Sequence, residues 1–382
     1  MLTLPTPTTQ AGLRAYYTFN SLANKQGNAT WNATLTGGQI NATNPQCAIT
    51  TELCREPVIP LVPIFTAPDT VCVNTPVQAV NLSAGQTTNY WSFCAANLAT
   101  APVGVNLGNP NNRLSLPTFM DYVKVGANYY GFVVNNTPSA LIRLDFGNSL
   151  LNTPTATNLT NFGGIIPTGN WAEGIQIIEN EGQWYVIMLW GNPAGDQSRL
   201  IKISFGSNIS NPAPTATNWG NIGNMSQPLD LHMFKNQDEW YGLVVNGLNN
   251  TVTRLAFTNN FSNTPTGVNL GNIGNLEYPT GICAVSNNGS WHAFVTNGGN
   301  SSRVTGNYTL SRLDFGSSLL NIPTGVNLGG LGGTLRHPRD ITILRSCDQI
   351  TGLIVNGYMN APSVVQLNFN NDLLSSPSFS SL

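Results

Sequence analysis

Apolar positions in this 382-residue chain recur in a short phrase that is repeated several times. The phrase reads EWYGLVVNG at residues 239–247, and altered copies occur at 128–136, 290–298 and 349–357. Its centre is apolar at successive positions instead of alternating, which predicts a strand buried on both faces. A catalytic motif is normally needed once, so the repetition predicts the building unit of an array.

A second phrase, typified by SRLDFGS at 311–317, gives the period of this array. Its shared phenylalanines, 52 to 59 residues apart, are Phe146, Phe205, Phe257, Phe315 and Phe369. A weaker copy at 89–109 places Phe93 one period before the first of them. Periods of about 50 residues are typical of solenoids, propellers and bead-like arrays.

Each unit reads as four short strands separated by Gly, Asn, Pro and Ser clusters, for example 280–285, 291–297, 309–315 and 323–328. A four-stranded sheet covered on both faces by its neighbours is a propeller blade. The sequence therefore predicts an all-β protein with a β-propeller over 58–382, preceded by a short β-rich segment, 1–57. We expect six four-stranded blades.

The blade count rests on residues 62–109, which we interpret as a divergent first blade. This stretch has no second-strand phrase, so five blades plus a separate β element is the alternative. Tandem immunoglobulin-like beads are disfavoured, because their units are nearer 100 residues and their strands alternate. Three strands end in Asn246-Gly247, Asn297-Gly298 and Asn356-Gly357, a dipeptide that predicts tight hairpin turns.

Composition narrows the classes of partner. Only 8% of residues are charged and the formal net charge is −2, so uncharged polar residues must cover the surface and no basic stripe is available for nucleic acid. No apolar run has the length of a membrane span. The start lacks the features of a signal peptide, and it opens on an incomplete module, which favours a piece of a longer precursor.

Six cysteines are too few for a disulfide scaffold. The spacings of Cys47 with Cys54, and of Cys72 with Cys94, would allow disulfides that close short loops. Buried free thiols are the alternative for these four residues. Cys283 and Cys347 lie in or beside strand phrases, where we expect packing roles.

The phrases RLDFG, PTGVNLGNIG and GNWYGFVVN resemble propeller repeats of large secreted surface proteins of Bacteroidota. Residues 65–94 resemble the opening of a PKD-type module, and residues 11–38 resemble part of a concanavalin-like (LamG) jelly roll. The resemblance implies export, often by type nine secretion, and a surface role in adhesion or gliding. The last residues, LLSSPSFSSL, do not match the sorting domain of that family.

Alignment of the first strands places Asp121, Gly174, Asp230, Gly281 and Asp340 at one equivalent position. A ring of carboxylates there, at the mouth of the channel, would suit a cation such as calcium, or sugar hydroxyls. No other cofactor is implied. The alternative is that these Asp residues begin strands and bond nearby backbone.

Cations recur in the third strand, at Arg143, Lys202, Arg254 and Arg312, with Gln366 in the last copy. They would suit an anion, but packing of an array also produces recurrence in register, and we favour packing. Three tryptophans outside the common phrase are candidates for surface contacts with sugar rings: Trp171, Trp190 and Trp219.

No motif of nucleophilic catalysis is present, and His232, His292 and His337 lack partners at metal-ligand spacing. Gly-rich stretches at 271–275 and 329–333 are interpreted as turns. The sequence thus favours a non-enzymatic adhesive or structural module of an extracellular surface protein or appendage. Its partners would be a glycan or protein on another surface, or neighbouring subunits. The alternatives are a carbohydrate-active enzyme or lectin-like propeller, and a viral receptor-binding fibre.

Overall fold

A computed structural model describes most of the repeat region of the chain. The described residues are 65–66, 80–82, 104–169, 172–192, 197–236, 238–258, 260–300, 306–346, 349–357, 362–370 and 372–381. The chain divides into two units, Met1–Pro57 and Val58–Leu382. The first unit, with the predicted LamG-like segment, lies outside the described residues.

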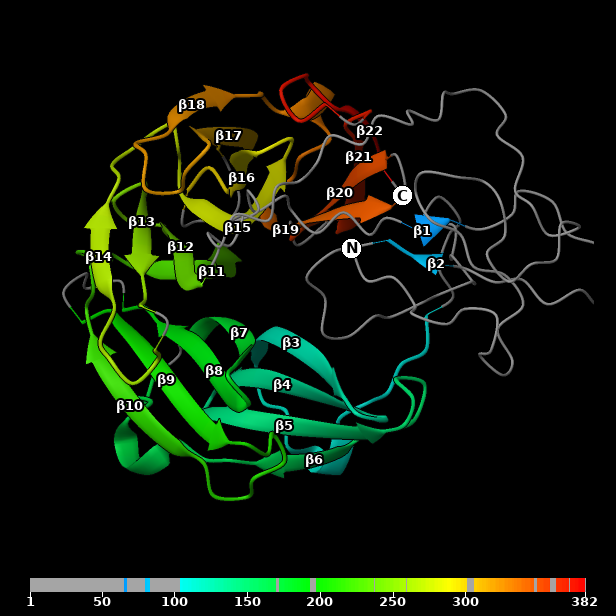
Figure 1. The fold of residues 1–382 in the computed structure, drawn as a ribbon, viewed down its shortest axis with the longest axis vertical. Coiled ribbons are helices and arrows are strands. Elements are labelled where there is room, and N and C mark those ends of the chain that lie inside the picture. The colour runs from blue at the N-terminus through cyan, green and yellow to red at the C-terminus, as the bar shows by residue number, and fades with distance from the viewer. Residues whose placement is uncertain are drawn as a thin grey trace, which may run out of the picture. The chain divides into compact units, whose positions relative to one another are not determined.

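The second unit is a β-propeller, as predicted. Five antiparallel four-stranded sheets, each made of consecutive strands, form its blades (Figure 1). Blade 1 contains β3 (Pro117–Val125), β4 (Asn128–Asn136), β5 (Ser139–Gly147) and β6 (Thr155–Asn158). Blade 2 contains β7 (Ala172–Asn180), β8 (Gln183–Trp190), β9 (Arg199–Gly206) and β10 (Thr215–Gly220). Blade 3 contains β11 (Pro228–Asn236), β12 (Glu239–Asn246), β13 (Thr251–Ala256) and β14 (Thr266–Asn269).

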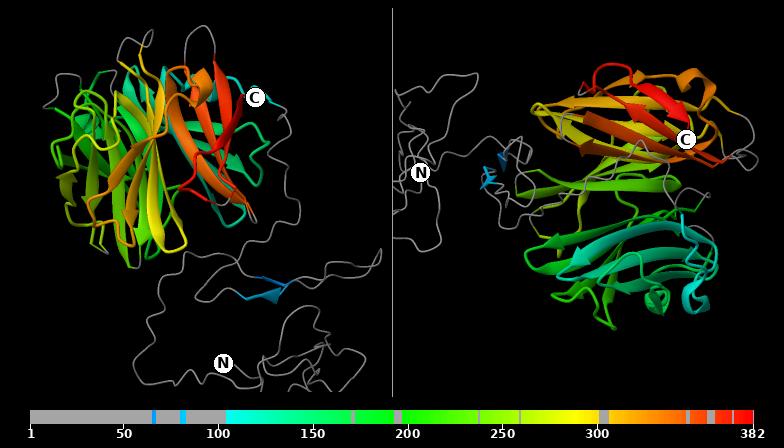
Figure 2. Two further views of the ribbon diagram at one scale, coloured as in Figure 1. Left: turned by 90° about the horizontal axis from the view of Figure 1, so that it is seen from above. Right: turned by 90° about the vertical axis from the view of Figure 1, so that its right-hand side faces the viewer.

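The last two blades repeat this pattern. Blade 4 contains β15 (Pro279–Asn287), β16 (Ser290–Asn297), β17 (Thr309–Gly316) and β18 (Thr324–Asn327). Blade 5 contains β19 (Pro338–Ser346), β20 (Gln349–Asn356), β21 (Ser363–Asn368) and β22 (Ser378–Ser381). The first strand of each blade lies nearest the common axis and the fourth lies at the rim (Figure 1). Figure 2 shows the twisted sheets standing beside one another from two further directions.

The prediction of six blades is not met, because the structure describes five. Of residues 62–109, it describes a two-stranded ribbon, β1 (Phe65–Thr66) with β2 (Val80–Asn81), and the stretch from Gly104 onward. This region lacks the continuous apolar phrase that forms the second strand of every described blade. The rest of it lies outside the described residues.

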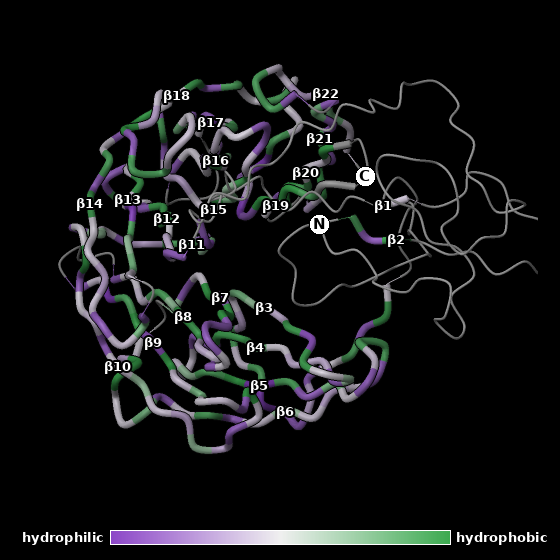
Figure 3. The backbone as a smooth tube through the Cα atoms, in the orientation of Figure 1, coloured by the Kyte–Doolittle hydropathy of each residue, from purple (hydrophilic) through white to green (hydrophobic). Residues whose placement is uncertain are grey.

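The hydrophobic core is divided among the spaces between blades. Apolar side chains of one sheet meet those of the next, as where Phe132 and Val134 of blade 1 pack with Val186 and Met188 of blade 2. Side chains of the second strands pack against both neighbouring blades. These strands are therefore buried on both faces, as their unbroken apolar pattern predicts. Apolar stretches accordingly follow strands such as β4 and β5 in Figure 3.

The Asn-Gly dipeptides that end three of the second strands do not form the predicted tight turns. Neither Asn246 nor Gly247 has a positive φ. Instead, the buried Asn246 amide accepts a hydrogen bond from the Ser226 backbone N–H at 3.3 Å and donates to Thr253 Oγ1 at 3.0 Å. Its oxygen therefore ties the end of the second strand to the loop that precedes the first strand of the same blade.

The same amide clamp recurs in three other blades, at Asn135, Asn297 and Asn356. In blade 2 the position is occupied by Trp190, which is buried. An Asn-Gly turn of the expected kind does occur elsewhere, between β15 and β16, where Asn288 has φ 50° and Gly289 has φ 76°.

Candidate functional site

The inner strands place two of the three predicted acidic residues, Asp230 and Asp340, at equivalent points around the axis. Asp230 on β11 pairs with Val245, Asp340 on β19 pairs with the matching Val355, and glycines occupy this point of β7 and β15. Asp121 on β3 pairs with Phe132 and lies two residues further along its strand, so the sequence alignment misplaced it. These glycines are required by the close approach of neighbouring strands. A Cβ on Gly174 would lie 2.8 Å from the Asp230 Cα, and one on Gly281 would lie 2.6 Å from the Asp340 Cα.

Two of the three aspartates connect successive blades. The Asp121 Oδ2 atom accepts a hydrogen bond from the Ile177 N–H of blade 2 at 2.7 Å. The Asp230 Oδ2 atom accepts one from the Ile282 N–H of blade 4 at 2.9 Å. In both residues the other oxygen accepts the N–H of the following residue. Backbone bonding was the alternative expected from the sequence, but it reaches the next blade and not only nearby residues.

Asp340 differs from the other two aspartates. Its Oδ1 atom accepts the Ile341 N–H at 2.7 Å, and the residue as a whole is exposed. Asp230 is buried and Asp121 is half-buried. Asp340 is therefore the one of the three that a dissolved ligand can reach most easily.

The carboxyl groups near the axis influence one another. Burial raises the pKa of Asp230 well above its usual range, and the negative charges of Asp340 and Glu173 raise it further, against the opposing effect of its two backbone hydrogen bonds. Partial desolvation by the surrounding protein also raises the pKa of Asp340, although the residue as a whole remains accessible to solvent. Burial raises the pKa of Asp121.

Glu173 is a member of this group that sequence reasoning missed. It is buried on β7, directly before Gly174, and its charge acts on Asp230. The available signal was a single acidic residue in the strand AEGIQII, at 172–178. The alignment of the first strands drew attention to the following residue, Gly174, and so gave no reason to select Glu173.

A histidine lies on the same inner strand as Asp230. Burial lowers the pKa of His232 to about 4, so its ring is neutral at neutral pH. Across the described ranges, no three His, Cys, Asp or Glu side chains are grouped in a way that would hold a metal ion. The arrangement near the axis thus offers carboxyl groups with raised pKa values, suited to proton transfer.

The recurring third-strand cations are packing residues, as favoured above. Each reaches a backbone carbonyl in the loop between the third and fourth strands of the next blade. The bonds run from Arg143 to Asn211, from Lys202 to Phe261, from Arg254 to Leu319 and Asn321, and from Arg312 to Leu373 and Leu374. We call these bonds the cation clasps. They join blade 1 to 2, 2 to 3, 3 to 4 and 4 to 5.

Two of the candidate surface tryptophans lie in the core. Trp190 packs between blades 1 and 2. Trp219 packs beside Phe257, with ring centroids 5.7 Å apart. Neither offers an exposed ring to a sugar, because the apolar space between blades takes up both. Trp171 lies outside the described residues, as do Cys47, Cys54, Cys72, Cys94 and Cys347, whereas Cys283 is a buried free thiol.

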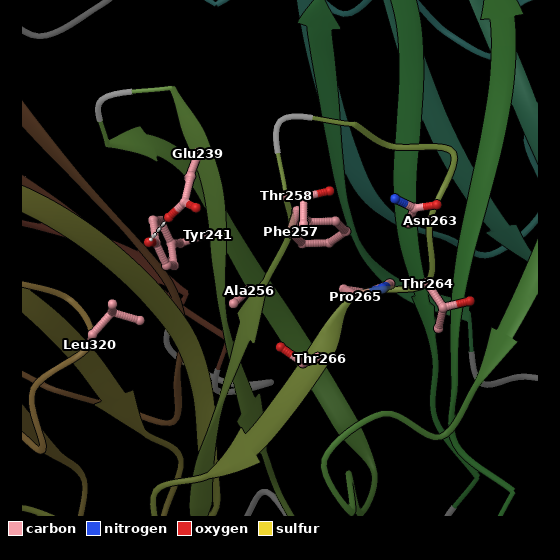
Figure 4. Close-up of a pocket in the computed structure, with 10 residues that line it drawn as sticks. All are labelled: Glu239, Tyr241, Ala256, Phe257, Thr258, Asn263, Thr264, Pro265, Thr266 and Leu320. Atoms are coloured by element: carbon pink, nitrogen blue, oxygen red, sulfur yellow. Dashed lines mark hydrogen bonds between the residues drawn. The ribbon is translucent and has the colours of Figure 1, made fainter.

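A small pocket lies between blade 3 and the rim of blade 4 (Figure 4). Its volume is about 190 Å³. Tyr241 donates a hydrogen bond from its hydroxyl to Glu239 Oε2 at 2.5 Å, and burial, followed by this bond and the Glu239 charge, raises the Tyr241 pKa to about 12. Ala256 gives the pocket room, since the matching residues of blades 1 and 4 are Asp145 and Asp314.

No family model matches the chain, and no curated protein matches it. Solved structures of glycoside hydrolases resemble it remotely. They include a thermostable family-43 glycoside hydrolase, with 10% identity, 71% of this chain and 95% of that chain covered, and a TM-score of 0.45. An α-L-arabinanase from Cellvibrio cellulosa has 9% identity, covers 70% and 95%, and has a TM-score of 0.46.

A third is the exo-β-1,3-galactanase of Phanerochaete chrysosporium solved with galactose, with 12% identity, 70% and 64% coverage, and a TM-score of 0.47. These neighbours are enzymes, and they overturn the expectation of a non-enzymatic adhesive module. At such low identity no residue of theirs is carried over to this chain. None of the helices in the described part of the chain has the length and apolarity of a membrane span.

Proposed function

We propose that the protein is a carbohydrate-active enzyme that cleaves glycosidic bonds near the propeller axis. The observation that carries this proposal is the group formed by Glu173, Asp230 and Asp340, contributed by three blades, in which the charges of two members raise the pKa of the third. Glycosidic cleavage uses one carboxylic acid and one carboxylate. A raised pKa keeps a carboxylic acid protonated at a pH where it is needed as a proton donor.

Accessibility and hydrogen bonding distinguish the roles. Asp340 is exposed and accepts one backbone hydrogen bond, so it is the proton donor to the glycosidic oxygen. As that C–O bond breaks, water adds to the anomeric carbon and gives its proton to Glu173. Asp230 is buried and held by two backbone N–H groups, so it is a positioning residue whose charge adjusts its neighbours.

The substrate class is part of the proposal. Arabinan and β-1,3-galactan are the first polymers to test, since a similar structure is an arabinanase and another a galactanase. An extracellular site of action is proposed as well, supported by the low content of charged residues and the resemblance to secreted repeats.

The test measures release of reducing sugar from these two polymers. We expect Asp340→Asn to lower kcat by at least about 100-fold, because the amide cannot donate the required proton in the same way. Asp238→Asn is the matched control, since Asp238 is exposed at the turn between β11 and β12, at the opposite end of β11 from Asp230. The proposal fails if neither polymer is cleaved by the wild-type protein, or if Asp340→Asn is as active as wild type.

A further inference from the structure

The row of blades has two ends that do not meet in the described part of the chain. Extensive contacts join β3 to β7, β7 to β11, β11 to β15 and β15 to β19, and no comparable contact joins β19 to β3. Figure 1 shows β3 and β19 on opposite sides of this interval. We call the facing surfaces of blades 5 and 1 the seam, and define them by Tyr122 on β3 and by Leu353 and Val355 on β20.

On the blade 5 side, Val355 is exposed where its counterparts are not. It is 47% exposed, whereas the matching residues of the other four blades, each directed at the following blade, are 0% exposed. Those residues are Val134, Leu189, Val245 and Thr296. Two residues earlier, Leu353 is half-buried, and its four counterparts are again fully buried. Blade 5 therefore keeps an apolar face built for a following blade.

On the blade 1 side, Tyr122 is exposed at a position where the other blades pack against the blade before them. It is 58% exposed, whereas the matching residues, each packed against the preceding blade, are buried or half-buried. Those residues are Ile177, Met233, Ala284 and Ile343. An apolar face with an uncovered aromatic ring is normally matched by a partner surface.

The chain itself approaches the seam immediately before blade 1. The stretch that begins at Gly104 lies against the outer face of this blade, where Leu114 packs with Ile142 and Phe146. There, Asn111 Oδ1 accepts the Ala156 N–H at 2.8 Å, which fixes the stretch to β6. The described chain thus enters blade 1 along the face that no other described blade covers.

We propose that residues 83–103 of the same chain occupy the seam and take the place of a further blade. They belong to the same unit as the blades, Val58–Leu382. Their sequence contains Tyr90, Trp91 and Phe93, and it aligns with the third-strand phrase one period before blade 1. Aromatic side chains of this kind match the apolar character of Tyr122, Leu353 and Val355.

The residue at the clasp position of blade 5 is consistent with a different kind of junction at the seam. The third strand of blade 5 has Gln366 where blades 1 to 4 have Arg or Lys. An uncharged side chain does not require the carbonyl cage that each cation occupies in the next blade. The occupant of the seam therefore need not carry the loop found in the other blades.

The first experiment measures maleimide labelling of the full chain with Tyr122→Cys or Val355→Cys, located by peptide mass mapping. Leu151→Cys is the control, because Leu151 is 90% exposed in a turn away from the seam. We expect the two seam thiols to react at least about 10-fold more slowly than the control thiol. Equal rates in the intact chain overturn the proposal.

The second experiment identifies what covers the seam. A benzophenone attached to the thiol of Tyr122→Cys is irradiated in the intact chain, and we expect cross-links within one chain to peptides from 83–103. Cross-links to a second copy, accompanied by a doubled mass in solution, overturn the proposal. Replacement of Tyr90, Trp91 and Phe93 by Ser is expected to restore fast labelling of both seam thiols, and unchanged slow labelling contradicts the assignment.

Discussion

At the residue scale, the inner strands depend on glycine at two points. Gly174 and Gly281 stand where the backbone of the following blade comes within 3 Å of the point that a Cβ atom would occupy, whereas β11 and β19 carry aspartate there. Because the clashing atoms belong to backbone, a small rotation of a side chain cannot relieve the overlap. Glycine is thus a packing requirement at these two points.

Gly281→Ala is expected to destabilise the fold by about 2 kcal/mol or more, because the new methyl group would lie 2.6 Å from the Asp340 Cα. Thermal unfolding followed by circular dichroism measures the effect. Gly104→Ala is the control, since no atom lies within 4 Å of its added methyl group and its φ is ordinary. Equal melting temperatures for the two variants would show that the strands separate easily.

A pH effect follows from His232. Its pKa is about 4 in the folded protein and about 6.5 in the unfolded chain, so between these values the unfolded chain binds more protons. The stability contributed by this residue is fully present above pH 6.5 and is lost as the pH falls through about 4. Asp230, with a raised pKa, acts in the opposite direction and favours the fold at low pH.

His232→Gln is therefore expected to reduce the fall in melting temperature between pH 7 and pH 4.5 by about 2–5 °C. Parallel melting curves of wild type and variant at five pH values measure this difference. An identical pH dependence in the two proteins would mean that the ring is protonated in the folded state.

At the same scale, the sequence aligned two of the three aspartates correctly and gave no information on what surrounds them. Alignment put Asp230 and Asp340 at one position, in agreement with the strand pairing, but it misplaced Asp121 by two residues. It could not find Glu173, which occurs in one blade only, or show that Trp190 and Trp219 face the core. Residues that recur can be placed by period, whereas residues that occur once need coordinates.

At the scale of elements, blades are joined by bonds that cross from one sheet to the next. The Arg312 guanidinium is buried, pairs with Asp314 at 2.8 Å and donates to two carbonyls of blade 5. The recurrence of cations was visible in the sequence. Their acceptors were not, since backbone carbonyls carry no signature of residue type.

Arg312→Met is expected to lower the free energy of unfolding by about 3 kcal/mol, because it removes the clasp and leaves Asp314 without the guanidinium. Urea denaturation measures the change. Gln366→Met alters the equivalent position of blade 5, which has no following blade among the described residues, and is expected to cost less than about 1 kcal/mol. Similar losses in both variants would contradict a specific role for the clasp.

At the scale of the whole molecule, the sequence predicted a propeller from period and from unbroken apolar strands. It did so because each blade must bury both faces against its neighbours. The expected number of blades exceeded the described number, since the weak copy at 89–109 has the third-strand phrase and lacks the second. The expectation of a non-enzymatic module was wrong because repeats report on architecture, while function depends on a few individual residues.

Each described blade is made of four consecutive strands, so no strand is exchanged between the first blade and the last. A duplicated gene segment of one period would consequently encode a complete module, with a cation for the module after it and a carbonyl loop for the module before it. Such an insertion leaves every existing sheet intact. Descendants of this gene can therefore differ in length by whole modules, and counting the periods in them would reveal that history.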